Sequence, residues 1–483
     1  MTTPSPFHSL TFDNAYARLP SAFHDRVAPT PLNKPFLVAI NPDAAALIGL
    51  EATTAVSAEF VDVFAGVTPL SGGEPVAMRY SGHQFGHYVP QLGDGRAILL
   101  GQVRNSCGER WDLHLKGAGQ TAFSRMGDGR AVLRSCIREY LCGEAMHGLG
   151  IPTTRSLCII GSETPVYRET LERGATLVRM AQSHVRFGSF EIFHHRNEVD
   201  NLRTLTEYVI EHDYPEFTGQ EDRYLRMFAE VVRRTAVLMA QWQAVGFAHG
   251  VMNTDNMSIL GLTLDYGPFG FVEEFDPGFI CNHSDDSGRY AFDQQASIGY
   301  WNLSCLAQAL TPLIDREALI ATVRTYADHF NVAVHELLCR KLGLPDPTEV
   351  DRDLWIGLLD LLAAQRVDYT NFFRVLGGDV DSLRGMFQAP EAWDAWAATY
   401  KARISGINPA DRQRHMDMVN PKYILRNYLA EAAIRKAEDA GDYREIEKLR
   451  VILSKPFDEQ PEHEQYALPA PAWGKRLVVS CSS

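Results

Sequence analysis

Residue types that bind metal ions and accept protons are concentrated in two short segments near the middle of the chain. Residues 249–256 read His-Gly-Val-Met-Asn-Thr-Asp-Asn, and Asp265-Tyr266-Gly267 follows shortly after. Asn256 and Asp265 carry amide and carboxylate oxygens, which are ligands that suit Mg²⁺. Asp255 stands beside Asn256, where a carboxylate could take a proton from a group held close to the ion. The two segments therefore predict a metal site assembled from two loops.

The spacing of these residues resembles the catalytic and metal loops of protein kinases, with one residue missing. A kinase catalytic loop carries an Asp base five residues before a metal-binding Asn, and the Asp of a D-F-G motif follows. Val251 stands where the base is expected, and its side chain cannot take a proton. The sequence thus keeps the nucleotide and metal half of a kinase site and lacks the residue that activates a hydroxyl.

The composition is that of an ordinary globular protein, with 45% apolar and 22% charged residues among 483. This length suits two or three domains, or one large two-lobed enzyme with additions. The net charge of −14 argues against a nucleic-acid partner. We expect no membrane segment, because no apolar stretch reaches spanning length, and no signal peptide is evident.

The eight cysteines include no Cys-x-x-Cys pair, so their spacing indicates neither a zinc site nor a thioredoxin motif. Sparse cysteines in a long chain favour a reducing compartment, and we expect a cytoplasmic protein.

Periodicity divides the chain into a mixed first part and a helical second part. Residues 97–103 and 111–116 read as strands bounded by Gly or polar turn residues, and 132–149 has apolar residues at helical spacing. Residues 430–453 are rich in strong helix formers. We predict an α+β, protein-kinase-like fold with a small sheet-containing N-lobe and a large helical C-lobe. The expected parts are an N-terminal extension packing on the core (1–75), the N-lobe (76–181), the C-lobe with the catalytic and metal loops (182–455), and a C-terminal tail (456–483).

Two glycine-containing turns are candidates for binding phosphate. Gly93-Asp94-Gly95-Arg96 precedes the first of these strands, and glycine lets the backbone approach a phosphate closely. A G-x-G-x-x-G motif would need Gly at Ile98, so an ordinary Asp-Gly hairpin turn explains the sequence equally well. The same pentapeptide recurs at 127–131 before a predicted helix, which makes Asp128 and Gly129 candidates for nucleotide contact.

Several basic residues could hold a polyphosphate. Lys116 ends a predicted strand, where it suits phosphate binding or simply faces solvent. A kinase lysine also needs a helix glutamate, and spacing does not choose between Glu139 and Glu144. Arg179 and Arg186, together with Arg96, are either phosphate clamps or ordinary surface arginines.

These pieces, taken in order along the chain, resemble the selenoprotein O family, also called the YdiU family. The segments that carry the resemblance are 80–86 (Tyr-Ser-Gly-His-Gln-Phe-Gly), 91–96, 116–121, 124–131, 249–256, 264–268, 279–283 and the terminal Cys481-Ser482-Ser483.

The resemblance implies a kinase-like pseudokinase fold in which ATP binds in a flipped orientation. AMP is then transferred to Ser, Thr or Tyr hydroxyls of protein substrates, with ATP as the other partner. It implies nucleotide contacts from Gly93, Gly95, Arg96, Lys116, Asp128, Gly129, Arg179 and Arg186. It assigns Asn256 and Asp265 as ligands of Mg²⁺, with Mn²⁺ as an alternative, and Asp255 as the proton acceptor. It also selects Glu139 as the partner of Lys116.

Two other functions fit the same residues. One is an atypical kinase that transfers the γ-phosphate with Asp255 as a displaced base, and the other is a non-catalytic ATP-binding scaffold. The retained metal-binding residues argue against the scaffold. A further hypothesis concerns redox control: the tail docks on the catalytic part, and Cys481 forms a reversible disulfide with Cys281.

Overall fold

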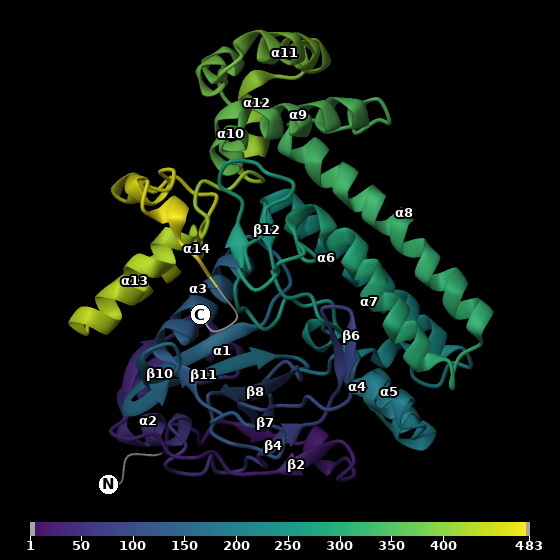
Figure 1. Ribbon diagram of the computed structural model, residues 1–483, viewed down its shortest axis with the longest axis vertical. Helices are drawn as coiled ribbons and strands as arrows, with labels where there is room; N and C mark the ends of the chain where they lie inside the picture. Colours follow the sequence, from purple (N-terminus) through teal and green to yellow (C-terminus); the bar gives the residue numbers. More distant parts are fainter. Residues whose placement is uncertain (1–4, 480–483) are drawn as a thin grey trace.

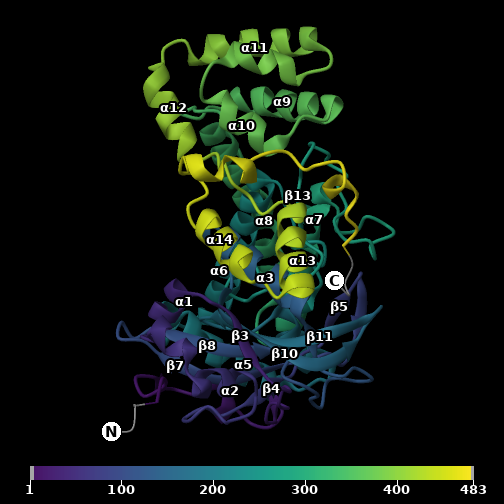
Figure 2. The ribbon, with the colours of Figure 1, turned by 90° about the vertical axis from the view of Figure 1, so that its left-hand side faces the viewer.

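The protein combines one large β-sheet with a larger set of helices (Figure 1). The computed structural model describes residues 5–479. In Figure 1 the sheet occupies the lower part of the molecule, and helices α6 to α12 form the upper part. Figure 2, turned by 90°, shows α13 and α14 facing the viewer, next to α3.

The sheet has nine strands, and its paired neighbours are antiparallel. Along the main path the order is β2-β4-β7-β8-β11-β10-β3, while β1 pairs with β7 and β9 with β11. Its strands are β1 (Thr11–Phe12), β2 (His24–Arg26), β3 (Phe36–Ile40), β4 (Val76–Met78), β7 (Ala97–Arg104), β8 (Arg110–Lys116), β9 (Ala131–Val132), β10 (Arg155–Tyr167) and β11 (Leu171–Ala181). Two separate pairs are β5 (Gly82–Gln84) with β6 (His87–Val89), and β12 (Phe247–Ala248) with β13 (Gly270–Phe271).

The two strands expected at 97–103 and 111–116 are present as β7 and β8, which pair with Ala97 opposite Lys116 and Val103 opposite Trp111. The first 75 residues contribute more to the sheet than their loop-rich sequence suggested. They supply β1, β2 and β3, and the last two form the opposite ends of the strand order. These strands are too short for alternation to show them in the sequence.

Helix α3 (Leu133–Gly148) is the helix expected at 132–149, and it packs on β10 and β11. The segment 430–453 is not one helix but two, α13 (Asn427–Ala440) and α14 (Arg444–Leu453). Gly441 separates them with a left-handed φ of 62° and ends α13. Glycine adopts this conformation at little cost, so the break occurs despite the strong helix formers around it.

The remaining helices lie either beside the sheet or in the helical part of the molecule. They are α1 (Pro42–Leu47) and α2 (Ala58–Phe64) beside the sheet, then α4 (Phe187–His195), α5 (Val199–Asp213), α6 (Arg223–Val245), α7 (Gln295–Leu310), α8 (Arg316–Lys341), α9 (Asp351–Gln365), α10 (Tyr369–Leu376), α11 (Pro390–Ile404) and α12 (Pro409–Asp417). The largest hydrophobic core joins α3, α13 and α14 to α4–α8, and a second core lies among α9–α11. Within residues 5–479, no helix has the length and apolar character needed to cross a membrane.

The C-terminal ends of α3 and α14 meet at a glycine. A Cβ placed on Gly148 would lie 2.0 Å from the carbonyl oxygen of Leu453, so the two backbones approach too closely for any side chain. We expect Gly148→Ala to lower the melting temperature, because overpacking costs about 1–3 kcal/mol and exceeds the gain in helix propensity.

Gly357 in α9 provides the matched control, since its Cβ would lie 4.0 Å from the nearest atom, in Trp396. Gly357→Ala should raise the melting temperature, through a gain in helix propensity of up to about 1 kcal/mol. Thermal unfolding of both variants tests the contact, and an unchanged or raised value for Gly148→Ala would contradict it.

Candidate active site

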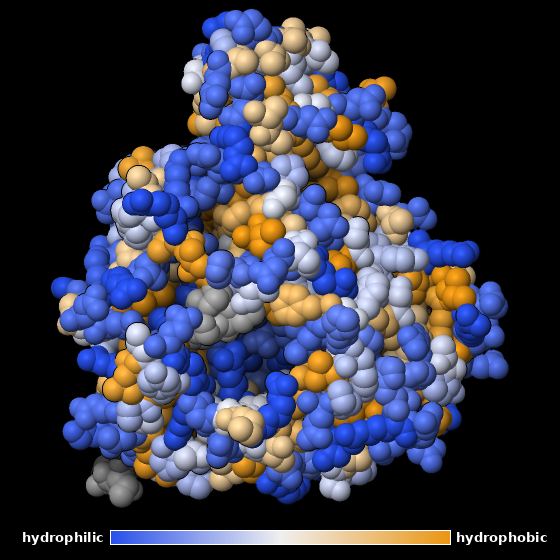
Figure 3. All heavy atoms as spheres, in the orientation of Figure 1, coloured by the Kyte–Doolittle hydropathy of each residue, from blue (hydrophilic) through white to orange (hydrophobic). Residues whose placement is uncertain are grey.

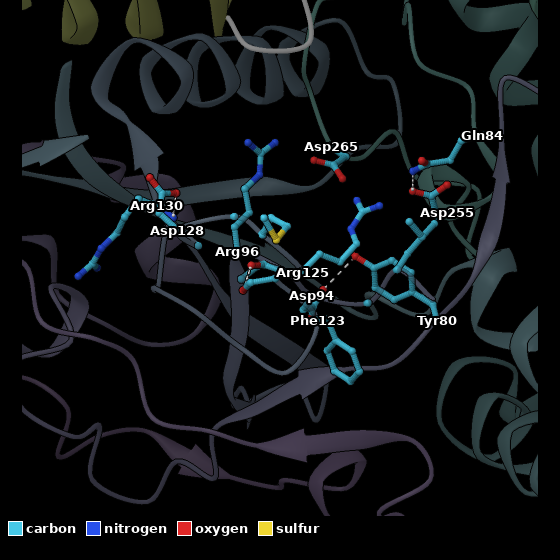
Figure 4. Close-up of a pocket in the computed structure, with 18 of the residues that line it drawn as sticks. Tyr80, Gln84, Asp94, Arg96, Phe123, Arg125, Asp128, Arg130, Asp255 and Asp265 are labelled. Carbon is cyan, nitrogen blue, oxygen red and sulfur yellow. Dashed lines mark hydrogen bonds between the residues drawn. The ribbon is translucent and has the colours of Figure 1, made fainter. Parts of the chain in front are cut away.

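A cleft of about 580 Å³ opens between the sheet and the helical part. Figure 3 shows a recess with hydrophilic residues on the face seen in Figure 1, and Figure 4 shows the side chains that line the cleft. The lining comes from four places in the chain, which are residues 80–97, the loop 123–130, the strands β10 and β11 with their flanking residues, and the two loops around Asp255 and Asp265. The lining includes six arginines and four aspartates: Arg96, Arg125, Arg130, Arg168, Arg179, Arg186, Asp94, Asp128, Asp255 and Asp265.

The two loops that contain Asp255 and Asp265 are held together at their bases by β12 and β13. Phe247 pairs with Phe271 and Ala248 with Gly270. The pairing brings together the two ends of the segment 249–269, which contains both loops. The His249 side chain contacts the carbonyl oxygen of Leu264 at 2.9 Å, which ties one loop to the other. This pairing brings the two segments singled out in the sequence to one wall of the cleft.

Asp265 lies between two buried arginines. One oxygen accepts a hydrogen bond from Arg179 Nη2 at 2.8 Å, and the other from Arg186 Nη1 at 3.0 Å. Although burial opposes ionisation, these guanidinium groups hold the pKa of Asp265 well below its usual range. The backbone of Asp265 is left-handed, with φ of 65°, a conformation that costs energy for a non-glycine residue and often occurs at functional sites. The site therefore fixes a fully ionised carboxylate facing the cleft.

A second buried carboxylate, Glu139 of α3, joins the sheet to this network. It accepts hydrogen bonds from Lys116 Nζ at 2.6 Å and from Arg179 Nη2 at 2.9 Å, and Arg179 Nε also donates to it. Burial opposes its ionisation, but Arg179 and Lys116 keep the pKa of Glu139 below its usual value. Glu144, which spacing left as an equal candidate, instead pairs with Arg155 at 2.7 Å. The structure thus settles the partner of Lys116 as Glu139.

Lys116 is itself buried at the end of β8, with its ammonium also 3.1 Å from Ser135 Oγ. It lies behind the cleft and does not line it, and the alternative of a solvent-facing strand end is wrong. Burial lowers the pKa of Lys116 from its usual value, while Glu139 acts in the opposite direction.

Asp255 differs from the other aspartates of the cleft. Its Oδ2 accepts a hydrogen bond from Gln84 Nε2 at 3.1 Å, and its buried Oδ1 has no hydrogen-bond partner within residues 5–479. Arg186 binds its main-chain oxygen at 2.6 Å and not its side chain. Burial raises the pKa of Asp255 to about 7. The carboxylate is therefore held in place by an amide and is available to accept a proton.

Both Gly-Asp-Gly turns pack closely against residues 119–124, the first against Phe123 and the second against Gly119. A Cβ on Gly93 would lie 2.5 Å from the Phe123 ring, and one on Gly95 would lie 2.8 Å from the Phe123 carbonyl oxygen. Gly129 has a φ of 68°, and its Cβ would lie 2.1 Å from Gly119. Close packing between the loops explains these glycines, and it places both turns in the cleft wall.

Asp94 lies between Gly93 and Gly95, and its side chain is buried beneath this first turn. Its carboxylate accepts hydrogen bonds from the Met78 backbone N–H at 3.0 Å and from the Tyr80 hydroxyl at 3.3 Å, and it contacts His114 Nε2 at 3.1 Å. These contacts fix the turn to β4 and β8.

Asp128 lies at the exposed rim and forms an ion pair with Arg168 at 2.8 Å. Arg96 and Arg125, by contrast, are exposed in the cleft and form no ion pair within the described part of the chain. Sequence reasoning missed Arg125, Arg168 and Gln84 as lining residues. Arg125 stands two residues before the second Gly-Asp-Gly turn, which was the available signal.

The side-chain oxygens of Asn256 and Asp265 both face the guanidinium group of Arg186. Arg186 Nη1 lies 3.3 Å from Asn256 Oδ1 and 3.0 Å from Asp265 Oδ2, so the amide and the carboxylate share a position that suits positive charge. Asn256 Nδ2 donates to the Val251 carbonyl oxygen at 3.0 Å, which turns its oxygen toward this position. The donor set fits an oxygen-preferring ion such as Mg²⁺.

Cys281 is buried beside the start of the 249–256 loop, where its thiol contacts the Ala248 carbonyl oxygen at 3.4 Å. The tail runs beside this segment, because the His283 N–H donates to the Val479 carbonyl oxygen at 2.9 Å. Cys481 lies outside the described residues, so its pairing with Cys281 stays a prediction.

Comparison with known proteins places the chain among the nucleotidyltransferases. It is 57% identical to the protein nucleotidyltransferase YdiU of Myxococcus xanthus strain DK1622, over 98% of this chain and 99% of the relative. Identity is also 57% to the YdiU of Thioalkalivibrio sulfidiphilus strain HL-EbGR7 and 55% to that of Thiobacillus denitrificans strain ATCC 25259, with the same coverage. The family model described as protein adenylyltransferase SelO matches residues 6–454. The chain belongs to the SelO family, and the resemblance noted in the sequence is confirmed.

The two glutamates of α3 allow a matched test of the charge network. Both are buried and both pair with arginine, but only Glu139 connects to Lys116 and Asp265. We expect Glu139→Gln and Glu144→Gln to lower the melting temperature, because each leaves a buried arginine without its charge partner.

Only Glu139→Gln should also reduce nucleotidyl transfer, by about tenfold or more, since it disturbs Lys116 and Arg179 together. Thermal unfolding and initial rates measured on the same preparations separate the two effects. Equal activity losses in the two variants would show that the network acts only through stability.

Proposed function

We propose that the enzyme transfers AMP from ATP to Ser, Thr or Tyr hydroxyls of protein substrates, in a kinase-like two-lobed fold with ATP bound in the flipped orientation. The sheet with its glycine turns would form the smaller lobe, and the part from α4 onward the larger one. The family description and the names of the relatives support nucleotidyl transfer to protein.

The observation that carries the proposal is the distribution of charge around the cleft. Three of the four lining aspartates contact a basic side chain: Asp94 contacts His114, Asp128 pairs with Arg168, and Asp265 pairs with Arg179 and Arg186. Asp255 is the one lining carboxylate without such a partner in residues 5–479. A proton acceptor needs this freedom, and Val251, at the position of the kinase base, cannot supply it.

The arginines of the cleft suit a polyphosphate whose far end lies inside the protein. Arg96 and Arg125 form no ion pair with any residue of 5–479, while Arg179 and Arg186 bring further positive charge to the buried wall. If the β- and γ-phosphates occupy this region, the α-phosphate is left nearest to Asp255. Flipped binding then presents the α-phosphorus to the substrate hydroxyl.

In the reaction, the substrate oxygen forms a bond to the α-phosphorus as the bond to the pyrophosphate oxygen breaks. The hydroxyl proton passes to the Asp255 carboxylate, and pyrophosphate leaves. Gln84 holds Asp255 in position through its amide. Asn256 and Asp265 would hold Mg²⁺, or Mn²⁺, which neutralises phosphate charge when bound. Arg179 keeps Asp265 ionised for that purpose.

Parallel reactions with α-labelled and γ-labelled ATP test the proposal. We expect protein to retain label from the α-position only, with a mass increase equal to AMP. Label retained from the γ-position would instead indicate phosphate transfer and contradict the proposal.

Two variants in the same assay separate the residue roles. Asp265→Ala should abolish transfer, because the metal position loses its carboxylate. Asp255→Asn should keep ATP affinity and lower the turnover number, as a base acts in the chemical step.

Arg96 offers a direct test of phosphate binding, because its side chain is exposed and the substitution would break no ion pair found among residues 5–479. A charge-assisted contact contributes about 1.5–3 kcal/mol. Arg96→Ala should therefore weaken ATP binding by about tenfold or more in calorimetric titrations. Arg324→Ala, which removes an exposed arginine from α8 outside the cleft, should leave the affinity unchanged. Equal ATP affinity in wild type and Arg96→Ala would exclude Arg96 from the phosphate site.

A further inference from the structure

Outside the cleft lining just described, two histidines and a glutamate come together between strand β5 and helix α4. His83 belongs to β5, while Glu191 and His195 belong to α4, where their i, i+4 spacing places them on one face. One ligand atom from each residue lies within 4.8 Å of the others. His83 Nδ1 and Glu191 Oε2 are already 2.5 Å apart.

Glu191 is the unusual member of this cluster. Its side chain is 1% exposed, and its Oε1 has no hydrogen-bond partner among residues 5–479. A buried carboxylate oxygen without a partner is costly, and a bound cation would remove that cost. His83 is 16% exposed and His195 is exposed, so an ion can reach the carboxylate from solvent.

Aromatic rings hold the two imidazoles close to this position. The His195 ring lies 3.9 Å from the Tyr88 ring, and His83 contacts the edge of Trp301 at 5.3 Å. These distances join ring centroids. The imidazole planes are therefore supported by packing, as ligand orientation in a metal site requires.

We propose that His83, Glu191 and His195 form a binding site for a divalent transition-metal ion of the zinc type. Two imidazole nitrogens and one carboxylate oxygen are a recurring zinc ligand set, which leaves a fourth position for water. Two atoms bound to one zinc ion, each at about 2.0–2.1 Å, can be at most about 4.2 Å apart. The ligand atoms of the cluster lie within 4.8 Å of one another, so a small rotation of the exposed His195 ring would bring them within this limit. Imidazole ligands favour zinc over Mg²⁺, which distinguishes this site from the oxygen donors Asn256 and Asp265.

The location gives the ion a structural consequence for the active site. The His83 backbone N–H donates to Thr254 Oγ1 at 2.7 Å, and the next residue, Gln84, donates to Asp255. An ion bound to both β5 and α4 would fix this strand against the loop that carries Asp255. The zinc proposal is independent of the proposed reaction, because its three ligands are not among the residues assigned to phosphate, Mg²⁺ or proton transfer.

Equilibrium dialysis of the full chain against Zn²⁺, in excess Mg²⁺ and after removal of metals by a chelator, tests the proposal. Co²⁺ serves as the spectroscopic probe, since imidazole ligands give it a visible absorption band. We expect one high-affinity Zn²⁺ per chain. His195→Ala and Glu191→Gln should weaken it by at least about 100-fold, because removal of a direct ligand should exceed the effect of a supporting residue. Zn²⁺ should also raise the melting temperature of the wild type by a few degrees, and not that of His195→Ala.

Two controls identify the position of the ion. His194→Ala removes the neighbouring histidine of α4, which lies outside the cluster, and should keep the Zn²⁺ affinity. Asp265→Ala removes a ligand of the other metal position and should also keep it. Absence of high-affinity Zn²⁺, equal affinity in His195→Ala, or loss of binding in Asp265→Ala would each overturn the proposal. His195 is exposed, so its substitution gives a result even if Glu191→Gln does not fold.

Discussion

The candidate active site depends on a continuous series of ion pairs that runs from the sheet through the protein interior to the loop of Asp265. Lys116 of β8 pairs with Glu139 of α3, Glu139 with Arg179 of β11, and Arg179 with Asp265, which also pairs with Arg186. Buried charges are costly unless each is matched, and removal of one member leaves its partner uncompensated. The sheet, the helix and the metal loop are therefore positioned by the same set of charges that the site uses.

Local sequence patterns predicted the elements that form the walls of the cleft. Strand β8 alternates in sequence, β7 is a short apolar run bounded by turn residues, and the spacing in 249–267 indicated two loops that do meet. Periodicity did not choose between Glu139 and Glu144, because α3 is buried on nearly all sides and has no polar face to orient it. Only the tertiary contacts with Lys116 and Arg155 separate the two residues.

Features made by contacts between distant parts of the chain could not be predicted in this way. The short strands β1, β2 and β3 lack a pattern of their own, and they form by pairing with β7, β4 and β10, which lie far from them in the sequence. The cluster of His83, Glu191 and His195 joins segments about a hundred residues apart. No short sequence motif links His83 to the other two residues over that distance. Arg125 became a candidate only when its loop was seen to face the cleft.

The position of β2 and β3 at opposite ends of the sheet has a consequence for how the chain is made. Both come from the first forty residues, but Ile40 pairs with Cys158 of β10, a strand that is synthesised much later. During translation β3 therefore has no strand to pair with at this edge until more than a hundred further residues have been synthesised. When β10 arrives, β3 covers an edge that would otherwise be open to pairing with another molecule. Strand β3 is thus made among the first strands of the sheet, although its partner in the sheet order, β10, is among the last.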